Sequence, residues 1–186
     1  MPAAVAQPIA ELSADLTDAQ AAHLWRVGAW GATSLVAGAT ILVTSDAEQA
    51  AGRRAFALQS AAWGAINLGI AAVGLAAGPP ETTTMLTDAL AAEERYGDIL
   101  WINTGLNVGY IAVGATLYAV GARAGVGRAQ EWKGHGLGVV MQGVGLLVLD
   151  GVALIGSQRR AGDLLDVLRS VDLAATGSGM TVVISL

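Results

Sequence analysis

The stretch DILWINTGLNVGYIAVGATLYAV, residues 98–120, decides the fold class. It is apolar and long enough to cross a bilayer, whose hydrocarbon core needs roughly 20 residues of α-helix. Asn103 and Asn107 are four residues apart and Tyr110 follows one turn later, so on a helix all three share one face. A membrane-length helix with two carboxamides and a phenol on one stripe predicts a polar interior shared with other helices.

Four segments of the chain reach membrane-spanning length. Backbone groups in lipid must be satisfied within the chain, and the apolar pattern lacks the alternation of barrel strands, so we expect helices. We predict an all-α fold: a four-transmembrane-helix antiparallel bundle over residues 23–156. Its spans are expected at about 23–44, 54–77, 98–121 and 134–156.

The composition supports this class. Of the 186 residues, 54% are hydrophobic and only 13% are charged, whereas soluble proteins carry roughly a quarter of charged residues. The 25 glycines and the single Phe suit helices that pack closely in lipid. The net charge of −5 gives no basic surface for nucleic acid. The absence of cysteine excludes disulfides and thiolate chemistry.

The regions outside the spans are amphipathic or loop-like. We expect an interfacial N-terminal region at 1–22, with a short helix at 9–22 and no cleavable signal peptide. A second short helix is expected at 82–96. The C-terminal region, 157–186, is expected to hold an amphipathic helix at 161–173 and a tail that rests on the membrane surface, with a strand or a tail that docks onto a partner as the alternative.

The sequence also hints at two duplicated helical hairpins. The tripeptide Gly-Ala-Thr occurs at 38–40 in the first span and at 114–116 in the third, each time within similar apolar residues. Two hairpins related by an axis along the membrane normal would produce this repeat. Glycines four residues apart further predict close helix crossings, at Gly105 with Gly109 and at Gly134 with Gly138.

Polar side chains form one stripe on each of three spans. Residues at spacings of three, four and eight share a helical face, so we expect the stripes to face a common interior. Arg26, one turn into the first span, can reach the same interior. The candidate ligand-binding residues are Gln59, Trp63, Asn67, Asn103, Asn107, Tyr110, Gln142, Asp150 and Arg26.

Asp150 is the acid expected deepest in the membrane. A buried carboxylate costs about 2.5–3.5 kcal/mol on insertion scales unless it is paired or neutral. Asp150 is therefore expected either to pair with Arg26, or to stay protonated and donate to Asn67 or Asn107.

Motifs for catalysis and for metals are absent from the sequence. It has no nucleophile elbow, no HExxH pattern and no phosphate-binding loop after a strand. His23 and His135 start different spans and are expected at opposite membrane faces, apart from each other. We therefore expect no enzyme activity, no metal site and no cofactor.

The stripes resemble those of an uncharacterised family of small bacterial integral membrane proteins. That resemblance implies a four-helix fold and a bacterial membrane, and it implies no activity. The chain departs from the family pattern at Asn107, where the family often has an acid, and at Gly64, where it often has Asn. The matching motifs are Trp63 with Asn67, Asn103-x-Gly105-Leu106-Asn107-x-x-Tyr110 and Gln142-Gly143-x-x-Leu146-Leu147-x-x-Asp150.

These observations predict a multi-pass protein of the bacterial cytoplasmic (inner) membrane, with the lipid bilayer as its surroundings. The counts of Lys and Arg lean weakly towards both termini outside. The main functional hypothesis is a polar core that binds a small polar ligand, a lipid headgroup or water. The alternative is a structural or accessory subunit of a membrane complex or homo-oligomer, with the stripes as interhelical glue. A third is an ion conduit through Asp150 and Arg26.

Overall fold

The structure is a computed structural model that describes residues 3–46, 50–123 and 127–177, and these residues form helices and no strand. The all-α prediction is therefore confirmed. The end of the predicted tail, 178–186, lies outside the described residues. The four helices are α1 (Ala3–Thr44), α2 (Ala51–Ala76), α3 (Leu86–Gly121) and α4 (Ala129–Gly177).

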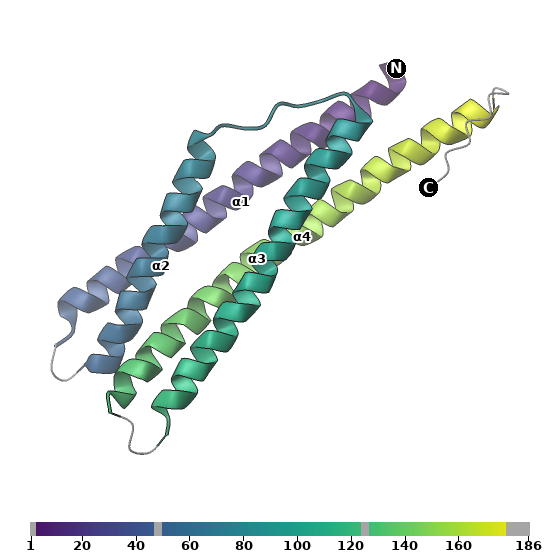
Figure 1. The fold of residues 1–186 in the computed structure, drawn as a ribbon. Helices are drawn as coiled ribbons and strands as arrows, with labels where there is room; N and C mark the ends of the chain where they lie inside the picture. Colours follow the sequence, from purple (N-terminus) through teal and green to yellow (C-terminus); the bar gives the residue numbers. More distant parts are fainter. Residues whose placement is uncertain (1–2, 47–49, 124–126, 178–186) are drawn as a thin grey trace.

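The helices form two antiparallel hairpins that lie against each other (Figure 1). α1 packs on α2 and α3 packs on α4, and the hairpins join mainly through α2 against α4. The end of α1, the start of α2, the end of α3 and the start of α4 lie at one end of the bundle, and the start of α1 and the end of α4 lie at the other (Figure 1). The antiparallel bundle expected from the sequence is confirmed.

Each helix buries one stripe of residues spaced alternately by three and four. This spacing is that of coiled coils and of most four-helix bundles, where the stripe of one helix packs against those of its neighbours. In α3 the stripe runs through both polar and apolar residues, so the polar side chains are part of the packing surface. Its buried members are Ala89, Glu93, Tyr96, Leu100, Asn107, Gly114 and Gly121.

Three helices are longer than the sequence predicted. The segments expected as separate short helices, at 9–22, 82–96 and 161–173, are parts of α1, α3 and α4, except that residues 82–85 precede α3. That expectation was wrong because charges near 94–98 and 158–163 mark a change in polarity without interrupting the helix. The buried stripe continues across each expected boundary, so packing keeps these helices intact.

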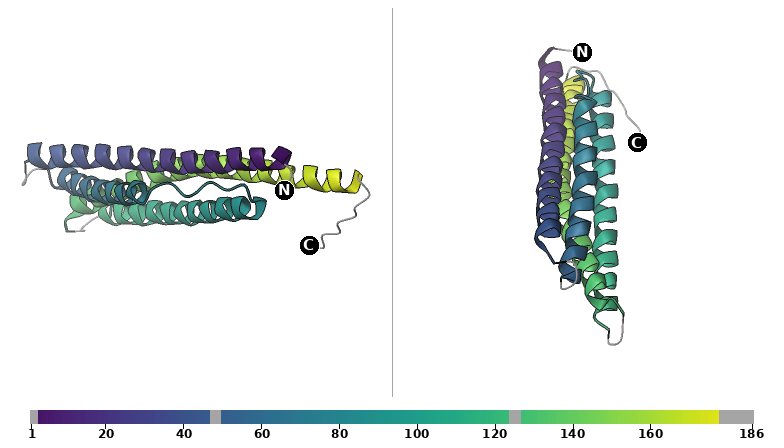
Figure 2. Two further views of the ribbon diagram at one scale, coloured as in Figure 1. Left: turned by 90° about the horizontal axis from the view of Figure 1, so that it is seen from above. Right: turned by 90° about the vertical axis from the view of Figure 1, so that its left-hand side faces the viewer.

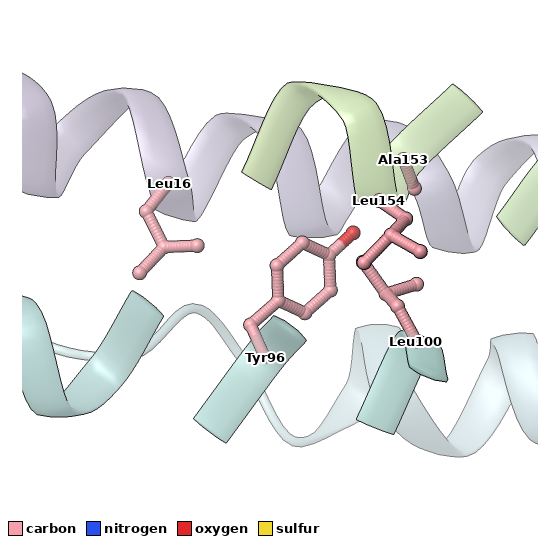
Figure 3. Packing of buried hydrophobic residues seen from close by; sticks show 5 residues of the cluster. All are labelled: Leu16, Tyr96, Leu100, Ala153 and Leu154. Atoms are coloured by element: carbon pink, nitrogen blue, oxygen red, sulfur yellow. The ribbon is translucent and has the colours of Figure 1, made fainter. Parts of the chain in front are cut away.

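The extra length builds a three-helix extension beyond the end of α2. At about 1.5 Å per residue, α2 is roughly 39 Å long and α1 roughly 63 Å. Ile9, Ala89 and Leu164 form the core of the extension. A second cluster packs nearer the end of α2 (Figure 3), and the side views show α1, α3 and α4 continuing past α2 (Figure 2).

Local interactions fix the end of α1 and the end of α2. Arg54 donates to the carbonyl oxygens of Leu42 and Ser45, at 2.8 and 3.1 Å, and so satisfies acceptors exposed at the end of α1. Gly78, with a φ of 77°, follows the last turn of α2 and adopts the left-handed conformation that terminates helices. Two prolines then prevent the helix from resuming.

Three helices contain a stretch long and apolar enough to cross a membrane: Ala6–Thr44, Ala51–Ala76 and Ala129–Ser170. Large apolar side chains point outward from them, with Val43 86% and Val73 72% exposed. α3 is not among the three, although a fourth span was expected at 98–121, because its polar stripe lowers its hydropathy. α3 nevertheless lies along α4 within the same bundle.

Glycines let the helices of each hairpin approach closely. A Cβ on Gly38 would lie 2.6 Å from the backbone oxygen of Ala57, and one on Gly114 would lie 2.7 Å from that of Gly136. The repeated Gly-Ala-Thr thus places a glycine at the crossing of each hairpin. The predicted crossing at Gly134 is confirmed, since a Cβ there would strike the backbone of Gly52.

The other predicted glycine pair has a different environment. Cβ atoms on Gly105 and Gly109 would meet no described atom within 4 Å, so these residues make no helix crossing within the chain. Gly138, in contrast, packs against Gln59 as a crossing residue should. The spacing of four identifies a small-residue face without specifying which neighbour, if any, covers it.

Candidate functional site

A cavity of about 450 Å³ lies between the helices near the end of α2, and all four helices contribute to its wall. Its wall is mostly apolar, with polar side chains set among leucines, isoleucines and aromatic rings. Six of the predicted site residues line it: Trp63, Asn67, Asn103, Asn107, Tyr110 and Asp150.

The cavity exists because the two hairpins do not pack symmetrically. α4 packs against α2 and also meets α1, but among the described residues no Cα of α2 lies within 8 Å of a Cα of α3. The rings of Trp63 and Tyr110 bridge this gap edge to face, with centroids 4.8 Å apart. Beyond them towards the end of α2 the gap remains open as the cavity.

Asp150 is 4% exposed and has a partner for each carboxylate oxygen. His23 Nε2 lies 3.0 Å from Oδ1, and Asn107 Nδ2 donates to Oδ2 at 2.6 Å. The predicted pairing with Arg26 is wrong, because Arg26 is exposed. His23 lies on the buried stripe of α1, with Leu16 and Val27 at spacings of seven and four, and Arg26 does not.

The contact with Asn107 also differs in kind from the expected one. The carboxylate of Asp150 accepts from the Asn107 amide instead of donating to it. This bond satisfies one of the acceptor positions that burial would otherwise leave without a partner. Together with His23 it accounts for how a carboxylate can be buried at this depth.

Three other buried polar atoms have no hydrogen-bond partner among the described residues, although they belong to residues lining the cavity. They are His23 Nδ1, Asn67 Nδ2 and the Tyr96 hydroxyl. These three residues are 7%, 3% and 8% exposed, respectively. Buried polar groups in folded proteins are almost always bonded, either to protein or to a bound molecule. Each of the three belongs to a residue of the cavity wall, so a rotation of its side chain would bring it to a molecule in the cavity.

Tyr96 sits at the border between the cavity and the extension. In Figure 3 its ring lies between Leu16 and Leu154, and its pKa is raised to about 12, chiefly by burial. The phenol is therefore neutral and able to donate at any physiological pH. One turn earlier, Glu93 forms a bidentate ion pair with Arg160, at 2.9 and 3.1 Å.

The sequence analysis did not identify His23 or Tyr96 as site residues. A signal for both was present, because each continues a stripe of three- and four-residue spacings from a neighbouring buried position. The sequence predicts His23 at the start of the first span, apart from His135 and outside the site. The true length of α1 would have placed it well inside the helix, level with Asp150.

Two predicted site residues lie elsewhere in the bundle. Gln142 is fully buried, accepts from Trp30 Nε1 at 2.8 Å and donates to Ser34 Oγ at 3.1 Å. Gln59 Nε2 lies 3.1 Å from His135 Nδ1, so His135 is not isolated either. These amides connect helices to each other, which is the interhelical role that small polar networks have in membranes.

Replacing Gln142 with Leu should destabilise the bundle by about 1–3 kcal/mol, because it leaves the Trp30 indole N–H and the Ser34 hydroxyl buried without their partner. Gln158→Leu, at an exposed position of the same helix, is the control and should change the free energy of unfolding little. Denaturation in mixed micelles measures both. Equal stability of the two variants would contradict the structural role of Gln142.

His23 and Asp150 do not make a metal site as they stand. Within residues 3–46, 50–123 and 127–177, no group of three or more His, Asp or Glu side chains is placed to hold a metal ion. The site offers instead one acid with both oxygens occupied, three groups without partners and an aromatic pair. This arrangement suits non-covalent binding of a small molecule through a few hydrogen bonds.

Comparison with known proteins gives a family and no function. Residues 26–151 match the model of a family of unknown function, DUF6992. This range holds most of the cavity wall, and it omits His23 and most of the three-helix extension. No curated protein and no solved structure matches the chain. Because the match covers more than half of its length, the chain belongs to DUF6992.

Proposed function

We propose that this chain is a non-enzymatic, multi-pass protein of the bacterial cytoplasmic membrane whose cavity binds a small molecule with a polar group. One observation carries the proposal: His23 Nδ1, Asn67 Nδ2 and the Tyr96 hydroxyl are buried, unpartnered and located on residues that line one cavity of about 450 Å³. Leaving such groups unpaired costs about 1–3 kcal/mol each, and a bound molecule removes that cost.

A binding role is favoured over catalysis by the residues of the wall. Among the described residues that line the cavity there is no Ser, Thr, Cys or Lys, so the common nucleophiles are missing from it. Asp150 has both oxygens engaged by His23 and Asn107. A carboxylate held in this way supports the shape of a site better than it serves as a general base.

The alternative, a structural or accessory subunit, rests on a different part of α3. Gly105 and Gly109 form a small-residue face that no described atom of the chain covers. A helix of another membrane protein, or of a second copy, would find close approach there. Both kinds of partner stay predictions, and so does the orientation with the termini outside, which would put the three-helix extension outside as well.

Asn67→Leu tests the binding proposal. This change removes an unpartnered buried amide without changing the side-chain size much, so the empty protein should be as stable as wild type or more stable by about 1–2 kcal/mol. The variant should instead lose the molecule that is bound to wild type. Native mass spectrometry after gentle extraction should find a non-protein mass on wild type and none on Asn67→Leu.

Gln59→Leu is the matched control for this experiment. It makes the same kind of change on the same helix, but Gln59 contacts His135 outside the cavity. It should keep the bound mass while losing some stability. The proposal fails if wild type carries no bound molecule, or if both variants retain it equally.

A further inference from the structure

We propose that the ligand of the cavity is a neutral lipid with a free hydroxyl group, which enters from the bilayer between α2 and α3. This inference rests on the proposed binding function and names the chemistry of the ligand. It is carried by the open gap between two helices, by the pairing of the acid in the wall and by the three unpartnered polar atoms.

The entrance faces sideways out of the bundle. The gap between α2 and α3 is closed on one side by the ring pair of Trp63 and Tyr110. On the other side the cavity wall includes Ile70, Ile99 and Leu106, each about half exposed although large and apolar. In a membrane, side chains of this kind at an open gap meet acyl chains. A molecule crossing them must itself carry an apolar portion.

The polar end of the cavity disfavours a charged ligand. Asp150 lines the wall with both oxygens paired, and the described lining residues include no Lys or Arg, so an anionic group such as a phosphate or carboxylate would find an acid there and no basic partner. The base nearest to Asp150, His23, is already bound to it at 3.0 Å. Both carboxyl oxygens of Asp150 already have a partner, so a cation would have to displace His23 or Asn107. A neutral group avoids both costs.

The unpartnered atoms specify which neutral group fits. Asn67 Nδ2 and the Tyr96 phenol are donors, and His23 Nδ1 is an acceptor when Nε2–H donates to Asp150. A hydroxyl group can accept from either donor or donate to His23, whereas a carbonyl can only accept. A hydroxyl can therefore pair with any one of the three atoms, and a ketone or ester only with Asn67 or Tyr96.

The test uses wild-type protein in phosphatidylcholine nanodiscs, which contain no free hydroxyl, with one of four probes that share a twelve-carbon chain. The probes are 1-dodecanol, dodecanoic acid, dodecylamine and dodecane at equal mole fraction. At saturation 1-dodecanol should raise the Tm by about 5–10 °C, the shift that binding at about 100 times Kd gives a protein of this size. The other three probes should raise it by less than a quarter of that.

Variants connect the shift to the cavity. The response to 1-dodecanol should be lost in Asn67→Leu or in Tyr96→Phe, depending on which donor the hydroxyl meets, while Gln59→Leu should keep it. If dodecanoic acid or dodecylamine stabilises the protein through Asn67 instead, the hydroxyl inference is overturned and the binding function stands. If no probe acts and gentle extraction yields no bound molecule, both are overturned.

Discussion

Gly64→Ala should destabilise the bundle by about 3 kcal/mol, at the upper end of the range for overpacking. Gly64 of α2 faces α1 where the two helices cross, and a Cβ there would collide with the backbone nitrogen of Leu35 and the backbone oxygen of Gly31. Neither atom can move aside as a flexible side chain would. The two helices must separate, and the contacts along the whole hairpin weaken together.

Gly69→Ala is the control for this change. It lies on the same helix, and a Cβ there would meet no described atom within 4 Å. It should be neutral or slightly stabilising, because Ala is the better helix former. Unfolding in mixed micelles, followed by circular dichroism, gives both free energies. If Gly64→Ala and Gly69→Ala had the same free energy of unfolding, α1 and α2 would not cross as closely as described.

Glu93→Ala should cost about 3 kcal/mol, because it leaves the guanidinium of Arg160, whose side chain is 14% exposed, without its partner. Glu93 is 2% exposed, and both of its oxygens accept from Arg160, at 2.9 and 3.1 Å. This pair connects α3 to α4 where the extension begins. The neighbouring Glu94 is exposed, so Glu94→Ala should change stability by less than about 0.5 kcal/mol.

A double variant separates the cost of an unpaired charge from the value of the pair. Glu93→Leu combined with Arg160→Met removes both charges and keeps most of the volume. It should recover most of the stability lost in Glu93→Ala, because buried ion pairs are often worth no more than well-packed apolar residues. The same denaturation experiment measures this. If the double variant were as unstable as Glu93→Ala, the ion pair itself would be the source of the stability.

Much of the interior was predictable from spacing alone. Asn67, Asn107 and Asp150 were each expected to face inward, and each is buried. The extents of the helices were not predicted, because charges near residues 94–98 were read as a break between two elements. Spacings of three and four residues run through that region without interruption, from Glu93 to Leu100. Periodicity was the better guide to helix length than polarity.

The sequence by itself determined which side chains turn inward, because a residue's direction on a helix follows from its position along that helix and from nothing distant. Only the tertiary structure decided which of them meet. Asp150 bonds His23 and Asn107 because the packing of α1, α3 and α4 brings these three side chains to one level of the bundle. The cavity exists because α2 stands away from α3, and that separation depends on how two hairpins pack across long stretches of chain.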